Sequence, residues 1–110
     1  MRHKPPQRVE YKKHTELLFE LRIVGEPGAG AGKRYKNERV YFRTQPNEQF
    51  RLAKCVRDKA DAKVVLVRAV IPPFQESDGK TLEYYMTVQL DGFSNSIGSQ
   101  SAPKSIHVKE

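Results

Sequence analysis

The 110-residue sequence has one cysteine, Cys55, and no tryptophan. One cysteine can form no internal disulfide and cannot complete a zinc site, so a reducing intracellular compartment is the simplest setting. No apolar run approaches the roughly 20 residues that cross a bilayer, and no apolar segment follows the basic N-terminus as in a secretory signal. We therefore expect an intracellular protein without a membrane-spanning segment.

Catalytic and cofactor motifs are also missing. His3, His14 and His107 do not stand at metal-ligand spacing, and Gly-x-Ser-x-Gly is absent. The glycine-rich segment is no P-loop, because Pro27 stands where the first glycine is needed and Arg34 replaces the magnesium-binding hydroxyl residue. We expect no enzymatic activity, no metal, no cofactor and no small-molecule substrate.

Positive charge is in excess and unevenly placed. Residues 1–63 carry 16 Lys/Arg against 8 Asp/Glu, whereas residues 64–110 carry 4 against 5, and the net charge is +7. A positive field concentrated in one part of a chain indicates a polyanionic partner, most commonly nucleic acid. An acidic protein or a membrane surface would satisfy the same charge.

Apolar and polar residues alternate in several short segments, which is typical of half-buried strands. The segment 15–24 also allows a short helix as the alternative, and the continuous valine-rich segment is expected to be buried on both faces. Residues 91–101 are expected to form a polar loop. The predicted strands are residues 15–24, 39–44, 50–56, 62–71, 82–90 and 105–108.

Short strands without a long helix predict an all-β fold, an immunoglobulin-like antiparallel β-sandwich of about seven strands. We expect one domain over residues 15–110, preceded by a flexible basic arm, residues 1–14, which holds two adjacent prolines and five Lys/Arg. The predicted buried residues are Phe19, Leu21, Ile23, Phe50, Leu66, Met86 and Val88.

The stretch 26–39 is a glycine-rich spacer that ends in dense charge. Lys33, Arg34, Lys36 and Arg39 place four cations within seven positions. Such a loop can follow a phosphate backbone or reach into a groove. The alternative is a solvated hairpin loop between two strands.

Two patches of the sequence resemble the Rel homology domain of Rel/NF-κB and NFAT transcription factors. Ile23-Val-Gly-Glu-Pro27, followed by Arg34-Tyr-Lys-Asn-Glu38, is similar to the start of that domain and its recognition loop. Residues 64–69 and 101–104 are similar to its last strands and linker.

This resemblance implies a nuclear DNA-binding domain that reads the major groove of double-stranded DNA through residues 33–39 and serves transcription regulation. Arg34 would contact a guanine, Tyr35 would pack against base methyls or the sugar, and Glu38 would accept a hydrogen bond from a cytosine. The remaining cations of the loop would hold phosphates, namely Lys33, Lys36 and Arg39.

Two other functions fit parts of the sequence. Residues 95–103, with the strand behind them, resemble the F–G loop and G strand of fibronectin type III domains, which implies a protein-interaction module with a protein partner or a dimer. That reading leaves the positive half unexplained, and the tryptophan usual in that core is absent. The other alternative is single-stranded RNA binding on an aromatic sheet face formed from Tyr41, Phe42, Tyr84 and Tyr85, although alternation places Tyr84 in the core.

Overall fold

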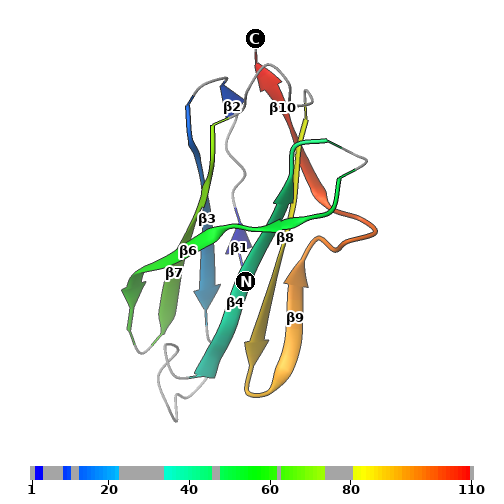
Figure 1. The fold of residues 1–110 in the computed structure, drawn as a ribbon. Helices are drawn as coiled ribbons and strands as arrows, with labels where there is room; N and C mark the ends of the chain where they lie inside the picture. The colour runs from blue at the N-terminus through cyan, green and yellow to red at the C-terminus, as the bar shows by residue number, and fades with distance from the viewer. Residues whose placement is uncertain are drawn as a thin grey trace.

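Two β-sheets face each other across a common core (Figure 1). The structure, a computed structural model, describes residues 2–3, 9–10, 13–22, 34–45, 48–61, 63–73 and 81–109. Every regular element of two or more residues in these ranges is a strand, as predicted. Within the described part of the chain, no helix has the length and apolarity needed to cross a membrane.

The first sheet contains four strands in the order β1-β3-β7-β6, and every neighbouring pair is antiparallel. Strand β3 runs along the whole length of β7, so these two form the centre of the sheet. The bounds are β1 (Arg2–His3), β3 (Thr15–Arg22), β6 (Lys54–Ala60) and β7 (Val64–Ile71).

The second sheet has the order β2-β10-β8-β4-β5. Strand β9 pairs with the second half of β8, and β10 pairs with its first half, so both lie on the same side of β8. Strand β2 is parallel to β10. The bounds are β2 (Val9–Glu10), β4 (Tyr35–Arg43), β5 (Arg51–Leu52), β8 (Thr81–Leu90), β9 (Phe93–Ile97) and β10 (Lys104–Lys109).

This strand order is that of an immunoglobulin domain. The first sheet reproduces the order A-B-E-D, and β4, β8 and β10 of the second sheet reproduce C-F-G, with β5 beside β4 as an added short strand. The chain changes sheets between β5 and β6, which are separated only by Ala53. The predicted fold class is therefore confirmed, and it forms without the inter-sheet disulfide and the tryptophan of antibody domains.

The core fills the space between the two sheets with one face of each long strand. Strands β3, β7 and β8 alternate between buried and partly or fully exposed residues, as expected for strands with one solvent-facing side. The predicted burial of Phe19, Leu21, Met86 and Val88 is confirmed, while Ile23 lies outside the described residues. The largest fully buried side chains include Tyr84, Phe19, Leu17, Leu21, Ile71 and Leu82.

Two of the expected core residues lie elsewhere. Leu66 is half-buried on the outer face of the first sheet, because β7 buries only one face instead of the two that its apolar run suggested. An antiparallel sheet commonly leaves one face to solvent. Phe50 is also only half-buried, and its ring meets the Tyr85 ring on the outer face of the second sheet.

Several predicted boundaries are also wrong. The second long strand begins at Tyr35 instead of residue 39, and β6 continues to Ala60, beyond the predicted strand end at residue 56. The polar segment 91–101 contains strand β9, which pairs with β8 although its side chains show no apolar period.

The N-terminal segment was expected to be a flexible arm, yet its described parts pair with both sheets. Strand β1 adds to the edge of the first sheet and β2 to the edge of the second. Short edge strands accommodate nearby prolines, because an edge residue needs fewer hydrogen-bond donors than a central one. The residues 1, 4–8, 11 and 12 of the expected arm lie outside the described part.

His3 anchors β1 against the core. Its Nδ1 donates to the Leu18 carbonyl oxygen at 2.6 Å, its Nε2 accepts from the Tyr84 hydroxyl at 2.5 Å, and its ring stacks on Phe19 with centroids 4.2 Å apart. Burial lowers the pKa of His3 and raises the pKa of Tyr84 to about 12. Both side chains are therefore neutral at physiological pH.

Candidate nucleic-acid interface

A bulge in β4 determines where the charged residues of the segment 34–39 point. Lys36 lies opposite Gln89 and Arg39 opposite Thr87, so the two residues between them share a single position on β8. In a regular strand, residues three apart would face opposite sides of the sheet. The extra residue places the exposed Lys36 and Arg39 on the same outer face of the second sheet.

Asn37 provides the backbone conformation that the bulge requires. Its φ of 56° lies in the left-handed region, which asparagine tolerates and β-branched residues do not. Asn37→Val should therefore lower the free energy of unfolding by about 1–2 kcal/mol more than Asn37→Gly, because both variants lose the amide and only valine is strained. Urea unfolding measures the difference, and equal losses would contradict a role for the backbone at this position.

Arg34 precedes β4 and is held by Asp91 in the β8–β9 turn. Its Nε lies 3.0 Å from Asp91 Oδ1, and its Nη2 lies 2.5 Å from Oδ2. The hydrogen bond from Arg34 lowers the pKa of the Asp91 carboxyl. The Asp91 backbone N–H also donates to the Arg34 carbonyl oxygen at 3.2 Å, so this pair closes one end of the sheet.

Two residues that the Rel resemblance assigned to bases have other partners in the structure. Tyr35 is only 2% exposed, and its hydroxyl donates to the Arg22 carbonyl oxygen at 2.5 Å, so its ring is a core element and does not face a ligand. Glu38 accepts two hydrogen bonds from Arg57, at 2.5 and 2.8 Å, across the edge of the sandwich. These hydrogen bonds lower the pKa of Glu38 and engage both carboxylate oxygens.

Of the six expected contact residues, the structure thus presents two as free cations on one surface. Lys36 and Arg39 form no ion pair among the described residues, whereas Arg34 is paired and Lys33 lies outside the described part. Lys36 and Arg39 extend from a strand inside the second sheet, not from a protruding loop.

Aromatic side chains continue this outer face away from the two cations. The Tyr41 and Tyr85 rings stack with centroids 4.9 Å apart, and the Phe50 ring meets Tyr85 edge-on at the same distance. The Arg43 guanidinium lies 4.4 Å from the Phe50 ring centroid and pairs with Glu83 at 3.1 Å. Of the four aromatic residues considered for RNA binding, Tyr41 and Tyr85 lie on this face, while Phe42 and Tyr84 are in the core.

A polar hollow of about 300 Å³ lies beside Arg39 and Tyr41. Residues from β4, β8 and β9 line it, among them several that the sequence did not mark as functional. Alternation along residues 82–90 did place Thr87 and Gln89 outward, but the contribution of β9 carried no signal. The side chains around the hollow are Asn37, Arg39, Tyr41, Thr87, Gln89 and Ser94.

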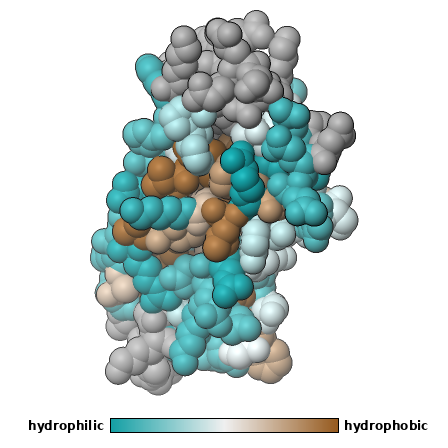
Figure 2. Space-filling model, in the orientation of Figure 1, coloured by the Kyte–Doolittle hydropathy of each residue, from teal (hydrophilic) through white to brown (hydrophobic). Residues whose placement is uncertain are grey.

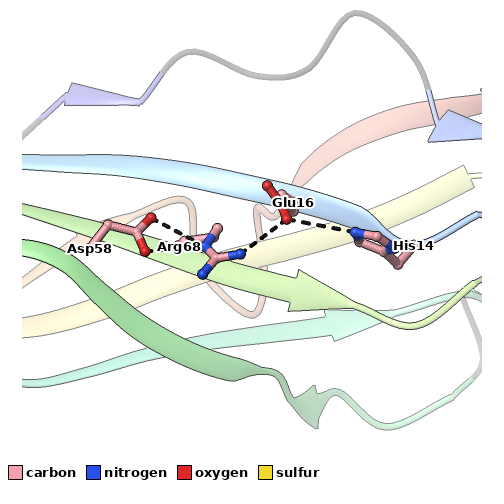
Figure 3. A network of polar contacts seen from close by, with 4 residues as sticks. All are labelled: His14, Glu16, Asp58 and Arg68. Atoms are coloured by element: carbon pink, nitrogen blue, oxygen red, sulfur yellow. Dashed lines mark hydrogen bonds and ion pairs between the residues drawn. The ribbon is translucent and has the colours of Figure 1, made fainter.

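The outer face of the first sheet has a different charge arrangement. Arg68 on β7 lies between Glu16 of β3, at 3.1 Å, and Asp58 of β6, at 3.2 Å, and His14 lies 3.6 Å from Glu16 (Figure 3). The two carboxylates raise the pKa of Arg68. This network neutralises its own arginine and presents acidic groups, so the face is a poorer surface for a polyanion.

A larger hollow opens where the chain crosses between the sheets. It measures about 790 Å³, and its lining includes Phe42, Ala53, Val70 and Pro72. Figure 2 shows apolar side chains gathered in the middle of the face that β6 crosses, framed by polar and charged ones. The Arg51 guanidinium lies 4.7 Å from the Phe42 ring centroid at this edge. The lining also includes titratable and charged side chains, namely His14, Glu16, Arg51, Lys54 and Arg68.

The described residues contain no group of three or more His, Cys, Asp or Glu side chains that could hold a metal ion. Cys55 is half-buried, and burial raises the pKa of its thiol, which favours the unreactive protonated form.

No protein-family model, curated protein or solved structure matches the chain.

Proposed function

We propose that this protein is a non-catalytic DNA-binding domain that holds the phosphate backbone on the outer face of its second sheet. The observation that carries the proposal is the bulge at Asn37, which turns two unpaired cations, Lys36 and Arg39, to one surface. The net charge of +7 supplies a long-range attraction for a polyanion. A nuclear location and a role in transcription regulation would follow from this activity.

The proposed contacts are to phosphates and not to base edges. Phosphate contacts fix a protein on nucleic acid without reading its sequence, whereas base reading needs free donors and acceptors that enter a groove. The side chains of Tyr35 and Glu38 are engaged inside the fold, and Arg34 would have to leave Asp91 to read a guanine. A selection from random duplexes should therefore enrich no consensus sequence. If the wild type enriched a consensus and Arg34→Ala lost it, Arg34 would contact a base, as the Rel resemblance implied.

The double variant Lys36→Gln, Arg39→Gln tests the phosphate contacts. It should weaken binding to every duplex sequence, because each lost contact removes counterion release from the association. The magnitude of the slope of log K against log salt concentration should fall by about 1 for each contact, so by about 2 in the double variant. Fluorescence anisotropy of a labelled mixed-sequence duplex, titrated at several salt concentrations, measures both quantities.

Lys54→Gln is the matched control for the loss of charge. Lys54 is an exposed strand lysine without an ion-pair partner among the described residues, but it lies on β6 in the other sheet. Its removal should change the salt slope much less than removal of Lys36. Equal slopes in the wild type and the double variant would refute the proposed surface.

Deletion of the N-terminal segment is a less direct test of DNA binding, because β1 and β2 are parts of the two sheets.

A protein-interaction module is the second candidate, and the aromatic cluster on the same face favours it. Tyrosine and arginine are enriched where protein interfaces bind most tightly, and Tyr41, Tyr85 and Arg43 lie together here. Leu52, which lies opposite Tyr41 on β5, is 61% exposed. If the protein self-associates through this cluster, its mass in sedimentation should rise with concentration, and Leu52→Ser should abolish that rise. Substitution of Lys36 or Arg39 should then have no effect on DNA binding.

A further inference from the structure

We propose that the polar hollow beside Arg39 receives one unpaired nucleobase, and that this face therefore binds single-stranded nucleic acid in preference to a duplex. This inference rests on the proposed function, because it assigns the ligand class of the same surface. The hollow lies directly beside one of the two free cations, with Asn37, Tyr41 and Gln89 among its lining residues. A strand held by its phosphates at Lys36 and Arg39 would pass over it.

The size of the hollow suits a single ring system. Its volume of about 300 Å³ is at the lower end of the roughly 300–1,000 Å³ found for small-molecule sites. A larger ligand would extend beyond the lining residues. A base that swings out of a strand while its phosphate stays on a cation is of the appropriate size.

The polar groups of the hollow suit the edge of a base. The Asn37 Nδ2 donates to Gln89 Oε1 at 2.9 Å, which leaves the Asn37 Oδ1 as an acceptor and the Gln89 Nε2 as a donor. The hydroxyls of Thr87 and Ser94 have no hydrogen-bond partner among the described residues. The Watson–Crick edge of every base presents both donors and acceptors, and an amide pair with two hydroxyls can match several of them.

Tyr41 and Arg39 provide flat groups beside these polar atoms. The Tyr41 ring is stacked on Tyr85 at an interplanar angle of 19°, so its orientation is fixed before a ligand arrives. Bases of single strands stack on aromatic rings and on arginine guanidinium planes without a strong sequence preference. A fixed ring lowers the entropic cost of that stacking.

A duplex cannot use this arrangement. Its Watson–Crick edges are paired and its base faces are stacked inside the helix, so a hollow in the outer face of a sheet reaches only its phosphates. An unpaired strand can turn a base into the hollow without first breaking a pair. The geometry therefore favours single strands over duplexes at equal phosphate contact.

Binding to a strand without bases separates the contribution of the hollow to the affinity from that of the phosphate contacts. Fluorescence anisotropy should compare a short single-stranded DNA, the corresponding RNA, the duplex and an abasic oligomer with the same backbone, at one salt concentration. The wild type should bind the single strand about 10-fold more tightly than the abasic oligomer and the duplex, because stacking of one base supplies that much. The DNA and RNA arms show which sugar is accommodated.

Two variants of the hollow should remove this preference while binding to the abasic oligomer stays unchanged. Tyr41→Leu removes the flat ring but keeps apolar volume, and Gln89→Ala removes the amide from an exposed position. Ser96→Ala, on the same face but outside the lining, is the control and should bind like the wild type. Circular dichroism and the melting temperature verify that each variant is folded.

The outcomes separate this inference from the proposed function. Equal affinity of the wild type for the single strand and the abasic oligomer would overturn the inference, since the bases would then contribute nothing. The phosphate surface would still stand if Lys36→Gln, Arg39→Gln weakened binding to both. If that double variant changed neither affinity, the proposed function itself would fail. A preference for single strands that persists in both Tyr41→Leu and Gln89→Ala would place the base elsewhere.

Discussion

Leu21→Ala should lower the free energy of unfolding by about 2–5 kcal/mol. Leu21 on β3 has no exposed surface and belongs to the core between the two sheets. Truncation removes buried methyl groups and leaves a cavity that close-packed neighbours fill only in part. Urea unfolding followed by far-ultraviolet circular dichroism measures the change as a lower midpoint with an unaltered slope.

Leu18→Ala, on the same strand, provides the matched control. Leu18 is 56% exposed on the outer face of the first sheet, so its truncation should change the stability by no more than about 0.5 kcal/mol. Leu66→Ala, on the half-buried face of β7, should fall between the two. A loss for Leu18→Ala as large as that for Leu21→Ala would mean that β3 faces the core with its other side.

Alternation predicted the faces of β3 and β8 because each of these strands has one buried and one open side. Leu17, Phe19 and Leu21 point inward on β3, as do Tyr84 and Met86 on β8. A period of two specifies which side chains share a face without any knowledge of the neighbouring strands. These two strands are central in their sheets, and their faces were predicted correctly from the sequence.

The outer faces were harder to predict, because an apolar residue does not reveal which side of a sheet is covered. The run from Val64 to Ile71 suggested a strand enclosed on both faces, whereas its outer residues are only half-buried. Phe50 likewise joins Tyr85 on the outside of the second sheet. Long neighbouring side chains can partly cover such residues in the absence of a second layer.

The sequence predicted the candidate site only in part, because the backbone conformation at Asn37 decides which side chains share a face. Lys36 and Arg39 were expected to contact phosphates and are the exposed cations of this segment. Simple alternation places two residues three apart on opposite faces of a strand. The bulge at Asn37 brings Lys36 and Arg39 to the same face. The same bulge turns Glu38 toward Arg57, so a residue that looked like a base reader forms an inter-sheet ion pair.

Glu38→Gln should lower the free energy of unfolding at neutral pH by about 1–3 kcal/mol, the range for hydrogen bonds to charged groups. The Glu38 side chain on β4 is only 15% exposed, and Arg57 on β6, 29% exposed, donates to both of its oxygens. Arg57 also donates to the Tyr35 carbonyl oxygen at 2.8 Å, so one side chain links the two sheets. Glutamine keeps the shape and loses the charge that Arg57 requires.

The pH dependence of that loss identifies the charge as its cause. Arg57 lowers the pKa of Glu38 below its ordinary value of 4.5, so the pair contributes fully above about pH 4.5 and progressively less as the pH falls through the lower folded-state pKa. The stability difference between the wild type and Glu38→Gln should therefore be constant near neutral pH and shrink in acid. Glu20→Gln, which breaks the more exposed pair with Arg22 on one strand, should cost no more than about 1 kcal/mol. A Glu38→Gln difference that persists after the carboxyl is protonated would attribute the loss to packing and not to the ion pair.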